Sequence, residues 1–371
     1  MPGAMLSLTM GTQFQLPSIR RFPMRSAIAT LVLALPGLVF GQDAPQKPSG
    51  VDAAIERGLA FLVKDALAWK EEHNCVSCHH AALVVWSIRE AKERGHAVDE
   101  PVLAELTKWV AESGDGTTGV PRPAAVPKAL NGKAVWFALA LSAVPQPDET
   151  TRQGLERVSK TIKSDQIENG SWASWPETRP PIFGNSDESM TALATLALLP
   201  AAANGDDEAK AVRDRGVRWL LETRSDEDPQ SIAVRLILWT KLGRPAEEWQ
   251  PLVQRIKERQ NADGGWSQAK DMPSDAWATG QALYALSHAA VRPDEPVVAR
   301  GRAFLIESQR ENGSWPMTSR PTVPGGKGST SLVPITGAGS AWGVLGLVRS
   351  RSVHPPVGAG PHRPRVGGTS D

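Results

Sequence analysis

The fold of this chain is decided by the stretch Arg300-Gly301-Arg-Ala-Phe304-Leu305 and the ending that follows it, Gln309-Arg-Glu-Asn-Gly313-Ser-Trp315. The ending Gln-x-x-x-Gly-x-Trp occurs twice more, as Gln166–Trp172 and as Gln260–Trp266. The last two copies start 49 residues apart and the first two start 94 apart. Because the longer gap is about twice the shorter, a degenerate copy should lie between them.

The degenerate copy is visible as an opening without an ending. Arg215-Gly216-Val-Arg-Trp219-Leu220 matches the opening at Arg300, and no Gln-Gly-Trp ending follows Glu222. Arg57-Gly58-Leu-Ala-Phe61-Leu62 is a further copy of the opening. The Gly of each ending suits a left-handed turn after a helix, and the Trp can pack over the junction to the next repeat.

Two kinds of predicted helix alternate along the chain. Amphipathic helices with one charged face are expected at 51–69, 100–113, 151–164, 207–223, 247–259 and 294–309. Helices that are apolar nearly all round are expected at 81–91, 133–143, 186–198, 231–242, 274–286 and 336–348. Ser or Asp opens the helices at 186 and 274, where either residue is a good N-cap.

These pairs predict an all-α fold, an (α/α)6 toroid from about 51 to 349 with polar helices outside and apolar helices inside. One hairpin cannot bury its apolar helix alone, and joining the hairpins into a ring removes the exposed ends. An open superhelical solenoid is the alternative. About six hairpins without an obvious polar capping repeat favour closure.

Composition bounds the function. The 371 residues carry a formal net charge of +1, which gives no argument for nucleic acid as a partner. Aromatic residues are unevenly used, with 13 Trp against 7 Phe and 1 Tyr. This bias indicates that Trp has a repeated structural task.

The N-terminus reads as a targeting segment over residues 1–41. Basic residues precede an apolar run from Ala27 to Phe40, and cleavage before Gln42 is expected; Met24 is an alternative start. A membrane anchor is the other interpretation, but the run is short for a bilayer. Residues 42–50 read as a linker and 350–371 as a disordered tail. No later apolar run looks long enough to span a membrane, so we expect an exported protein, periplasmic or secreted, without a stable span after cleavage.

The repeat at 300–315 resembles the QW repeat of squalene–hopene and oxidosqualene cyclases, and protein prenyltransferases share that helical ring. The resemblance covers most of residues 51–349. Three clear copies make it specific for the fold and much less specific for activity.

The cyclase resemblance implies an acidic segment, Asp-x-Asp-Asp-Thr, whose middle Asp protonates an alkene. The corresponding residues are Asp275-Ala-Trp277-Ala278-Thr279, so both later acids are replaced. Asp187-Glu-Ser-Met-Thr191 departs in the same way. Asp187 and Asp275 are therefore either N-caps of buried helices or acids facing a central cavity. Protein prenyltransferases hold zinc through an Asp, a Cys and a His on separate helices, and the cysteines here lack that context.

The sharpest local motif is Cys75-Val76-Ser77-Cys78-His79, which His80 follows. Cys-x-x-Cys-His in an exported chain is the attachment signature of haem c, with His79 ligating the iron. A local disulfide or thiol-exchange pair, a zinc site that includes His79 or His80, and simple packing remain open. Alignment of Trp86 with Tyr284 places the motif at the same rim of the ring as the two acids.

Three hypotheses follow from the sequence. The first is an exported toroid with covalent haem at Cys75, Cys78 and His79 that exchanges electrons with a redox partner. The second is a divergent terpenoid cyclase or transferase that acts on an isoprenoid, with Asp187 and Asp275 as acids. The third is a scaffold without catalysis that binds an apolar small molecule in the central cavity.

Overall fold

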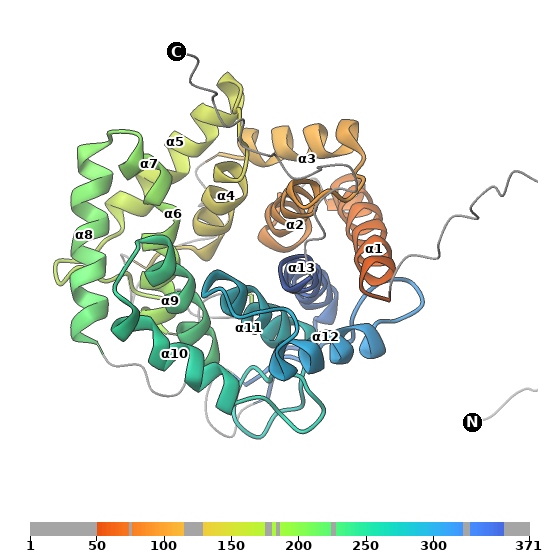
Figure 1. Ribbon diagram of the computed structural model, residues 1–371. Coiled ribbons are helices and arrows are strands. Elements are labelled where there is room, and N and C mark those ends of the chain that lie inside the picture. The colour runs from red at the N-terminus through yellow and green to blue at the C-terminus, as the bar shows by residue number, and fades with distance from the viewer. Residues whose placement is uncertain are drawn as a thin grey trace, which may run out of the picture. The chain divides into compact units, whose positions relative to one another are not determined.

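Twelve of the helices form two concentric rings in the computed structural model, which describes residues 50–73, 76–114, 129–174, 180–182, 186–223, 228–321 and 327–351 (Figure 1). The predicted targeting segment (residues 1–41), residues 42–49 of the predicted linker and residues 352–371 of the predicted tail lie outside these ranges. Within them every regular element is a helix; the rest is turns, loops and two isolated bridges, and these residues contain no β-strand. The predicted all-α class is confirmed.

The outer ring consists of the amphipathic helices. They are α1 (Gly50–His73), α3 (Glu100–Glu112), α5 (Glu149–Ser164), α8 (Asp207–Glu222), α10 (Ala246–Glu258) and α12 (Pro296–Ser308). A short helix that the sequence pattern does not predict, α7 (Leu199–Ala203), comes just before α8 in the chain.

The inner ring consists of the apolar helices. They are α2 (Leu83–Glu93, preceded by the π-helical turn η1, Cys78–Ala82), α4 (Gly132–Ser142), α6 (Asp187–Ala197), α9 (Pro229–Lys241), α11 (Ala276–His288) and α13 (Leu332–Ser350). Each inner helix packs on the next, and α13 packs on α2, so the ring is closed. The alternative of an open solenoid is thereby excluded.

α13 is an instructive exception to the sequence analysis. Among the described residues, this helix alone has the length and apolar composition of a membrane span, and 78% of that span is buried inside the ring. The sequence analysis expected no such run after the leader. Gly280 of α11 and Gly346 of α13 let the two backbones approach closely, since a Cβ on Gly280 would lie 2.1 Å from the Trp342 carbonyl oxygen. Burial against neighbouring helices accounts for the apolar character of α13.

The Gln-Gly-Trp endings join consecutive outer helices with one repeated set of contacts. At the ring closure, Gln309 Nε2 donates to the carbonyl oxygens of Gly313 and Ala54, and Arg57 donates to Gln309 Oε1. Gly313 has a φ of +87°, and a Cβ there would lie 2.1 Å from the Arg57 carbonyl oxygen. This glycine is therefore required both by its left-handed conformation and by the close approach of α1.

Trp315 completes the junction. Its Nε1 donates to the carbonyl oxygen of Leu305 at 2.7 Å, and its backbone N–H donates to Ser340 Oγ at 3.1 Å. Its ring packs on Gly58, the glycine of the repeat opening on α1. The two other copies make the corresponding contacts, with Trp172 against Gly216 and Trp266 against Gly301. The predicted left-handed Gly and the predicted packing of the Trp over the junction are both confirmed.

Candidate functional site

Aromatic rings fill one side of the space inside the inner ring. Trp277 of α11 makes edge contacts with Trp136 of α4 at 6.2 Å and with Trp342 of α13 at 6.1 Å between ring centroids. Trp86 of α2 contacts Trp342 at 5.3 Å and Tyr284 of α11 at 5.5 Å. All five side chains are buried. Edge-to-face arrangements of this kind are the favourable geometry for aromatic pairs, so the cluster ties four inner helices together.

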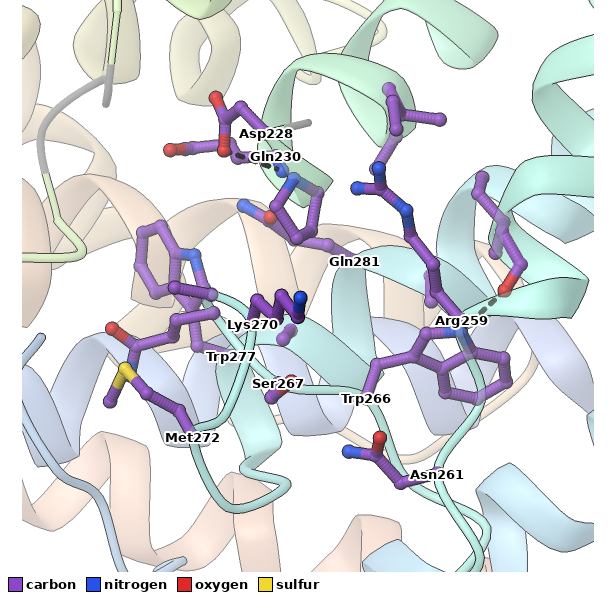
Figure 2. Close-up of a pocket in the computed structure, with 18 of the residues that line it drawn as sticks. Asp228, Gln230, Arg259, Asn261, Trp266, Ser267, Lys270, Met272, Trp277 and Gln281 are labelled. Atoms are coloured by element: carbon purple, nitrogen blue, oxygen red, sulfur yellow. Dashed lines mark hydrogen bonds between the residues drawn. The ribbon is translucent and has the colours of Figure 1, made fainter. Parts of the chain in front are cut away.

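A cavity of about 970 Å³ lies beside this cluster, at the N-terminal ends of α9 and α11. Figure 2 shows its walls, which come from α9, α11, the end of α10 and the loop 261–275. The volume is at the upper end of the range for small-molecule sites. The sequence analysis predicted a cavity inside the ring but not its position.

One wall of the cavity is apolar. It is formed by side chains from the two inner helices and the loop: Ile232, Ala233, Met272, Trp277, Ala278 and Ala282. The loop also contributes Asp271, whose φ of +65° is unusual for a residue with a side chain. A backbone held in that conformation is commonest at turns and functional sites.

Three glutamines bring polar atoms to the same cavity. Gln230 is the second residue of α9, Gln281 lies on α11, and Gln268 lies in the loop; all three are at most 3% exposed. Both amide atoms of Gln230, Nε2 of Gln281 and Oε1 of Gln268 have no hydrogen-bond partner among the described residues. Buried amide groups are almost always hydrogen-bonded, and leaving one unpaired costs about 1–3 kcal/mol. A bound molecule or water would supply these partners.

Asp275 sits next to the cavity and not among the residues that line it. It is the N-cap of α11: its Oδ1 accepts the N–H of Ala278 at 2.9 Å, and its Oδ2 accepts Nε2 of Gln268 at 2.7 Å. Burial raises the pKa of Asp275 to about 6, against the opposing effect of these two hydrogen bonds. The arrangement is that of a capping residue that also fixes one cavity glutamine.

Asp187 plays a smaller part. It is the first residue of α6, exposed, and accepts the backbone N–H of Ser174 at 2.8 Å. Ser186, one residue earlier, is the N-cap and forms a capping box with Ser189. Asp187 does not line the cavity.

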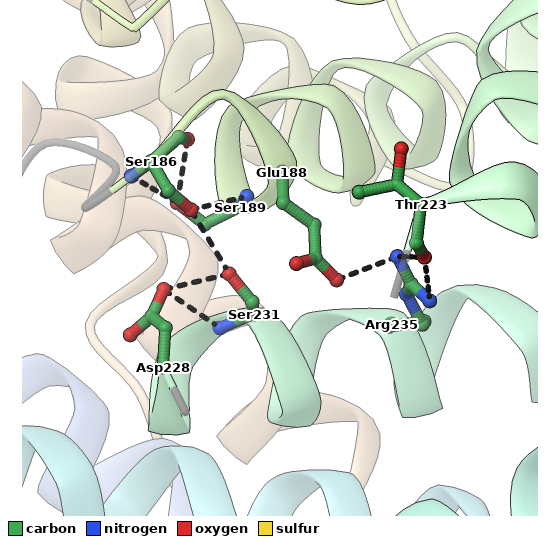
Figure 3. Close-up of polar contacts among 7 residues, drawn as sticks. All are labelled: Ser186, Glu188, Ser189, Thr223, Asp228, Ser231 and Arg235. Carbon is green, nitrogen blue, oxygen red and sulfur yellow. Dashed lines mark hydrogen bonds and ion pairs between the residues drawn. The ribbon is translucent and has the colours of Figure 1, made fainter. Parts of the chain in front are cut away.

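The N-terminal ends of α6 and α9 are joined by a polar network that the sequence analysis missed (Figure 3). Ser186 Oγ lies 3.2 Å from Ser231 Oγ, and Asp228, which lines the cavity, accepts from Ser231 Oγ at 2.6 Å. One turn further along, Glu188 pairs with Arg235 at 2.5 Å, and both side chains are buried. Desolvation lowers the pKa of Arg235, while the nearby Glu188 opposes that change. This network holds one edge of the cavity in place.

The Cys-His segment lies at the rim that the sequence register predicted, because Ser77 is the N-cap of η1 just as Asp275 is the N-cap of α11. Cys78, His79 and His80 are buried, and none of them lines the cavity. Cys75 lies outside the described residues. Haem attachment at Cys75, Cys78 and His79 therefore stays a prediction.

A second buried polar cluster lies at the opposite ends of the inner helices. Glu90 accepts hydrogen bonds from Tyr284 Oη at 2.6 Å and from Arg349 Nε at 2.7 Å. The Arg349 and Tyr284 contacts lower the pKa of Glu90 although burial acts in the opposite direction. Burial, together with the charges of Arg349 and Lys241, lowers the pKa of His288 to about 3, so its imidazole stays neutral. Because the carboxylate and guanidinium are paired, this cluster has a structural explanation.

Comparisons with known proteins agree with this fold. Residues 213–309 match the family model described as the squalene-hopene cyclase N-terminal domain. A solved structure of the type II terpene cyclase MstE from Scytonema, with merosterolic acid A as product, is 15% identical; the match covers 81% of this chain and 97% of that chain, with a TM-score of 0.50. No curated protein matches the sequence.

Two further structures share the fold at comparable distance. A polysaccharide lyase is 10% identical, with 81% of this chain and 97% of that chain covered and a TM-score of 0.54. A protein from Actinoplanes is 13% identical, with 81% and 99% covered and a TM-score of 0.51. At such identities the likeness concerns the fold alone, because one fold hosts unrelated activities.

Proposed function

We propose that this chain, a divergent member of the squalene–hopene cyclase-like superfamily of α/α toroids, binds an oxygenated terpenoid in the cavity between α9 and α11. The proposal rests on one observation: Gln230, Gln268 and Gln281 have unpaired amide atoms, and they lie in a cavity with one apolar wall. We take export to the periplasm or outside the cell as part of the same proposal.

The apolar wall of the cavity supports a molecule with an apolar body. Ile232, Ala278 and Trp277 offer hydrocarbon and aromatic surface, which gains about 25 cal/mol per Å² of apolar area removed from water. The free Nε2 of Gln281 calls for an acceptor, and the free Oε1 of Gln268 calls for a donor. A hydroxyl group satisfies both requirements. The type II terpene cyclase MstE, which shares this fold, has been solved with its product, merosterolic acid A.

The proposal does not include polyene cyclisation. Trp277 stands where the resemblance to cyclases would place the protonating acid, and its ring belongs to the central aromatic cluster. Asp275 is engaged by Ala278 and Gln268, and its pKa of about 6 leaves it mostly ionised at neutral pH. An ionised carboxylate has no proton to give to an alkene.

The test compares geranylgeraniol, which has a hydroxyl group, with squalene, which is a hydrocarbon. Binding is followed by calorimetry and by the fluorescence of the tryptophans, two of which, Trp266 and Trp277, line the cavity. We expect geranylgeraniol to bind and the Gln281→Leu variant to lose affinity about tenfold, the value of one hydrogen bond.

The matched control is Gln254→Leu, the same substitution at a glutamine on α10 whose contact with Glu258 is exposed. It should bind geranylgeraniol as the parent does. Equal binding of squalene and geranylgeraniol, or no effect of Gln281→Leu, would contradict the role of the amides. A cyclised product after incubation with either compound would contradict the exclusion of cyclisation.

A further inference from the structure

The contacts of Asp275 decide how one of the cavity glutamines is turned. Asp275 is 4% exposed and borders the cavity without lining it. Its Oδ2 accepts Nε2 of Gln268 at 2.7 Å, and the carbonyl oxygen of Thr318 accepts the same nitrogen at 2.8 Å. Oε1 of Gln268 is buried and has no hydrogen-bond partner among the described residues. The protein therefore holds one side of this amide and leaves the other side for a ligand.

Both groups that hold the Gln268 amide can only accept hydrogen bonds. An ionised carboxylate and a backbone carbonyl oxygen have no hydrogen to give, so the NH2 group of Gln268 must be turned toward them. The opposite orientation would place Oε1 against two acceptors and lose both hydrogen bonds. Ionised Asp275 thus fixes an acceptor, Oε1, as the unpaired atom of Gln268. A ligand at this position must donate a hydrogen bond.

We propose that Asp275 is a positioning residue for the cavity: in its ionised form it selects ligands that donate a hydrogen bond to Gln268, and its protonation removes this selection. The inference rests on the proposed function of the cavity and names the hydrogen-bonding class of the ligand. A terpenoid alcohol has the required hydrogen. An ether of the same carbon skeleton does not have it, because its oxygen only accepts.

Protonation disturbs the arrangement because both oxygens of Asp275 already accept from donors. Oδ1 accepts the backbone N–H of Ala278 at 2.9 Å, which is the capping bond of α11. A hydrogen on Oδ1 would break this cap, so we expect it on Oδ2, where it opposes the NH2 group of Gln268. The amide then loses its bond to Asp275, or it rotates and loses its bond to Thr318. In both cases Oε1 is no longer held in one position.

Burial and hydrogen bonds set the pH at which this change occurs. Burial raises the pKa of Asp275 to about 6, while hydrogen bonds from Ala278, Gln268 and Trp277 act in the opposite direction. No charge on a described residue contributes to this shift. The charged side chains that the surrounding elements bring to the cavity are Asp228 of α9, Glu258 and Arg259 of α10, Lys270 and Asp271 of the loop, and Arg320. Because the alcohol binds the ionised form better, its affinity should fall as the pH falls through about 6.

The experiment measures the affinity of the full chain for geranylgeraniol and for its methyl ether by calorimetry between pH 5 and pH 7.5. We expect the affinity for the alcohol to fall about tenfold toward pH 5, the value of one hydrogen bond. The affinity for the ether should change less than about twofold, because the ether makes no hydrogen bond to Oε1. Equal falls for both compounds, or no fall for the alcohol, overturn the proposal.

Asp275→Asn imitates the protonated residue at every pH. Its oxygen can still accept the N–H of Ala278, and its NH2 group stands where Oδ2 lies and opposes the NH2 group of Gln268. Affinity for geranylgeraniol should be about tenfold lower than in the parent at pH 7.5 and should not depend on pH. The matched control is Asp148→Asn at the N-cap of α5, where the aspartate accepts the N–H of Thr151 at 2.8 Å. It should keep the pH profile of the parent.

Nuclear magnetic resonance of the ligand-free protein separates this proposal from the proposed function. The side-chain amide signal of Gln268, assigned with Gln268→Leu, should shift around pH 6 in the parent and stay constant in Asp275→Asn. Binding of geranylgeraniol without any response of affinity or signal to pH overturns the role of Asp275 and leaves the proposed function standing. No binding at any pH contradicts the proposed function and the selection together, although a titrating signal would still show that Asp275 orients Gln268. Far-ultraviolet circular dichroism checks that each variant is folded.

Discussion

Glutamines with little or partial exposure occur in two regions of this protein and serve different purposes there. In the junctions between outer helices, the amides of Gln166, Gln260 and Gln309 each donate to two backbone carbonyl oxygens and accept from an arginine. In the cavity, Gln230, Gln268 and Gln281 retain amide atoms without partners. The residue type is the same in both regions, but the pairing differs, and so does burial: the cavity glutamines are all buried, whereas Gln260 and Gln309 in the junctions are half-buried.

This difference distinguishes glutamines that stabilise the fold from glutamines that are available to bind a ligand. A buried polar group that is fully hydrogen-bonded fixes the geometry of its neighbours, whereas an unpaired one lowers stability until something binds it. The three junctions have the same set of hydrogen bonds because each joins the end of one outer helix to the next outer helix. The cavity glutamines share no repeated set of contacts, as we expect of groups that are arranged around a ligand.

The largest effect is expected at a junction. Trp315→Ala removes a fully buried ring that packs on Gly58 and bonds to Leu305, and should lower the free energy of unfolding by about 3–5 kcal/mol. Urea denaturation followed by circular dichroism measures the loss. Trp249→Ala on α10, where the side chain is only half-buried, is the control and should cost clearly less. Equal losses of unfolding free energy in the two variants would show that the junction tryptophan stabilises the fold no more than the control tryptophan does.

The next effect concerns Asp275, which borders both regions because it caps α11 and holds Gln268. Its pKa is raised to about 6 from an ordinary value of 3.8, so between these pH values the folded state binds more protons than the unfolded state. Stability from this group is therefore present below pH 3.8 and is lost as the pH rises through 6. The shift corresponds to about 3 kcal/mol.

Asp275→Asn isolates this contribution. The free energy of unfolding of the parent minus that of the variant should fall between pH 4 and pH 7, by about 3 kcal/mol, when both are measured by urea denaturation. A difference that is constant with pH would show that the carboxyl group is not perturbed by burial.

The smallest effect comes from a direct comparison of one junction glutamine with one cavity glutamine. Gln309→Leu leaves the carbonyl oxygens of Ala54 and Gly313 and the Arg57 guanidinium without their partner, and should cost about 1–3 kcal/mol. Gln230→Leu removes two unpaired amide atoms and should leave stability unchanged or increase it by about 1 kcal/mol. Thermal and urea unfolding of the two variants side by side measures the contrast. A cost for Gln230→Leu as large as that for Gln309→Leu would mean that its amide is paired inside the protein.

Much of the fold could be predicted from the sequence because its signals are local. The repeat spacing, the charge of outer helices and the small apolar residues of inner helices each lie within one hairpin, and hairpins of this kind have few ways to bury their inner faces. The capping role of Asp275 was also one of two predicted alternatives, because a cap is made with residues three positions away.

The candidate sites depended on contacts between distant parts of the chain. The repeated ending marks Gln309 in the sequence, but nothing there marks Gln230, and two partners of Gln309 come from α1, more than two hundred residues earlier. The sequence marked Asp275 as a cap or an acid, but the Thr318 carbonyl oxygen that holds the neighbouring Gln268 amide comes from the segment before α13. The sequence by itself thus determined the helical pairs and their order. Tertiary structure decided which buried polar groups find partners, since that depends on atoms that meet only when the ring closes.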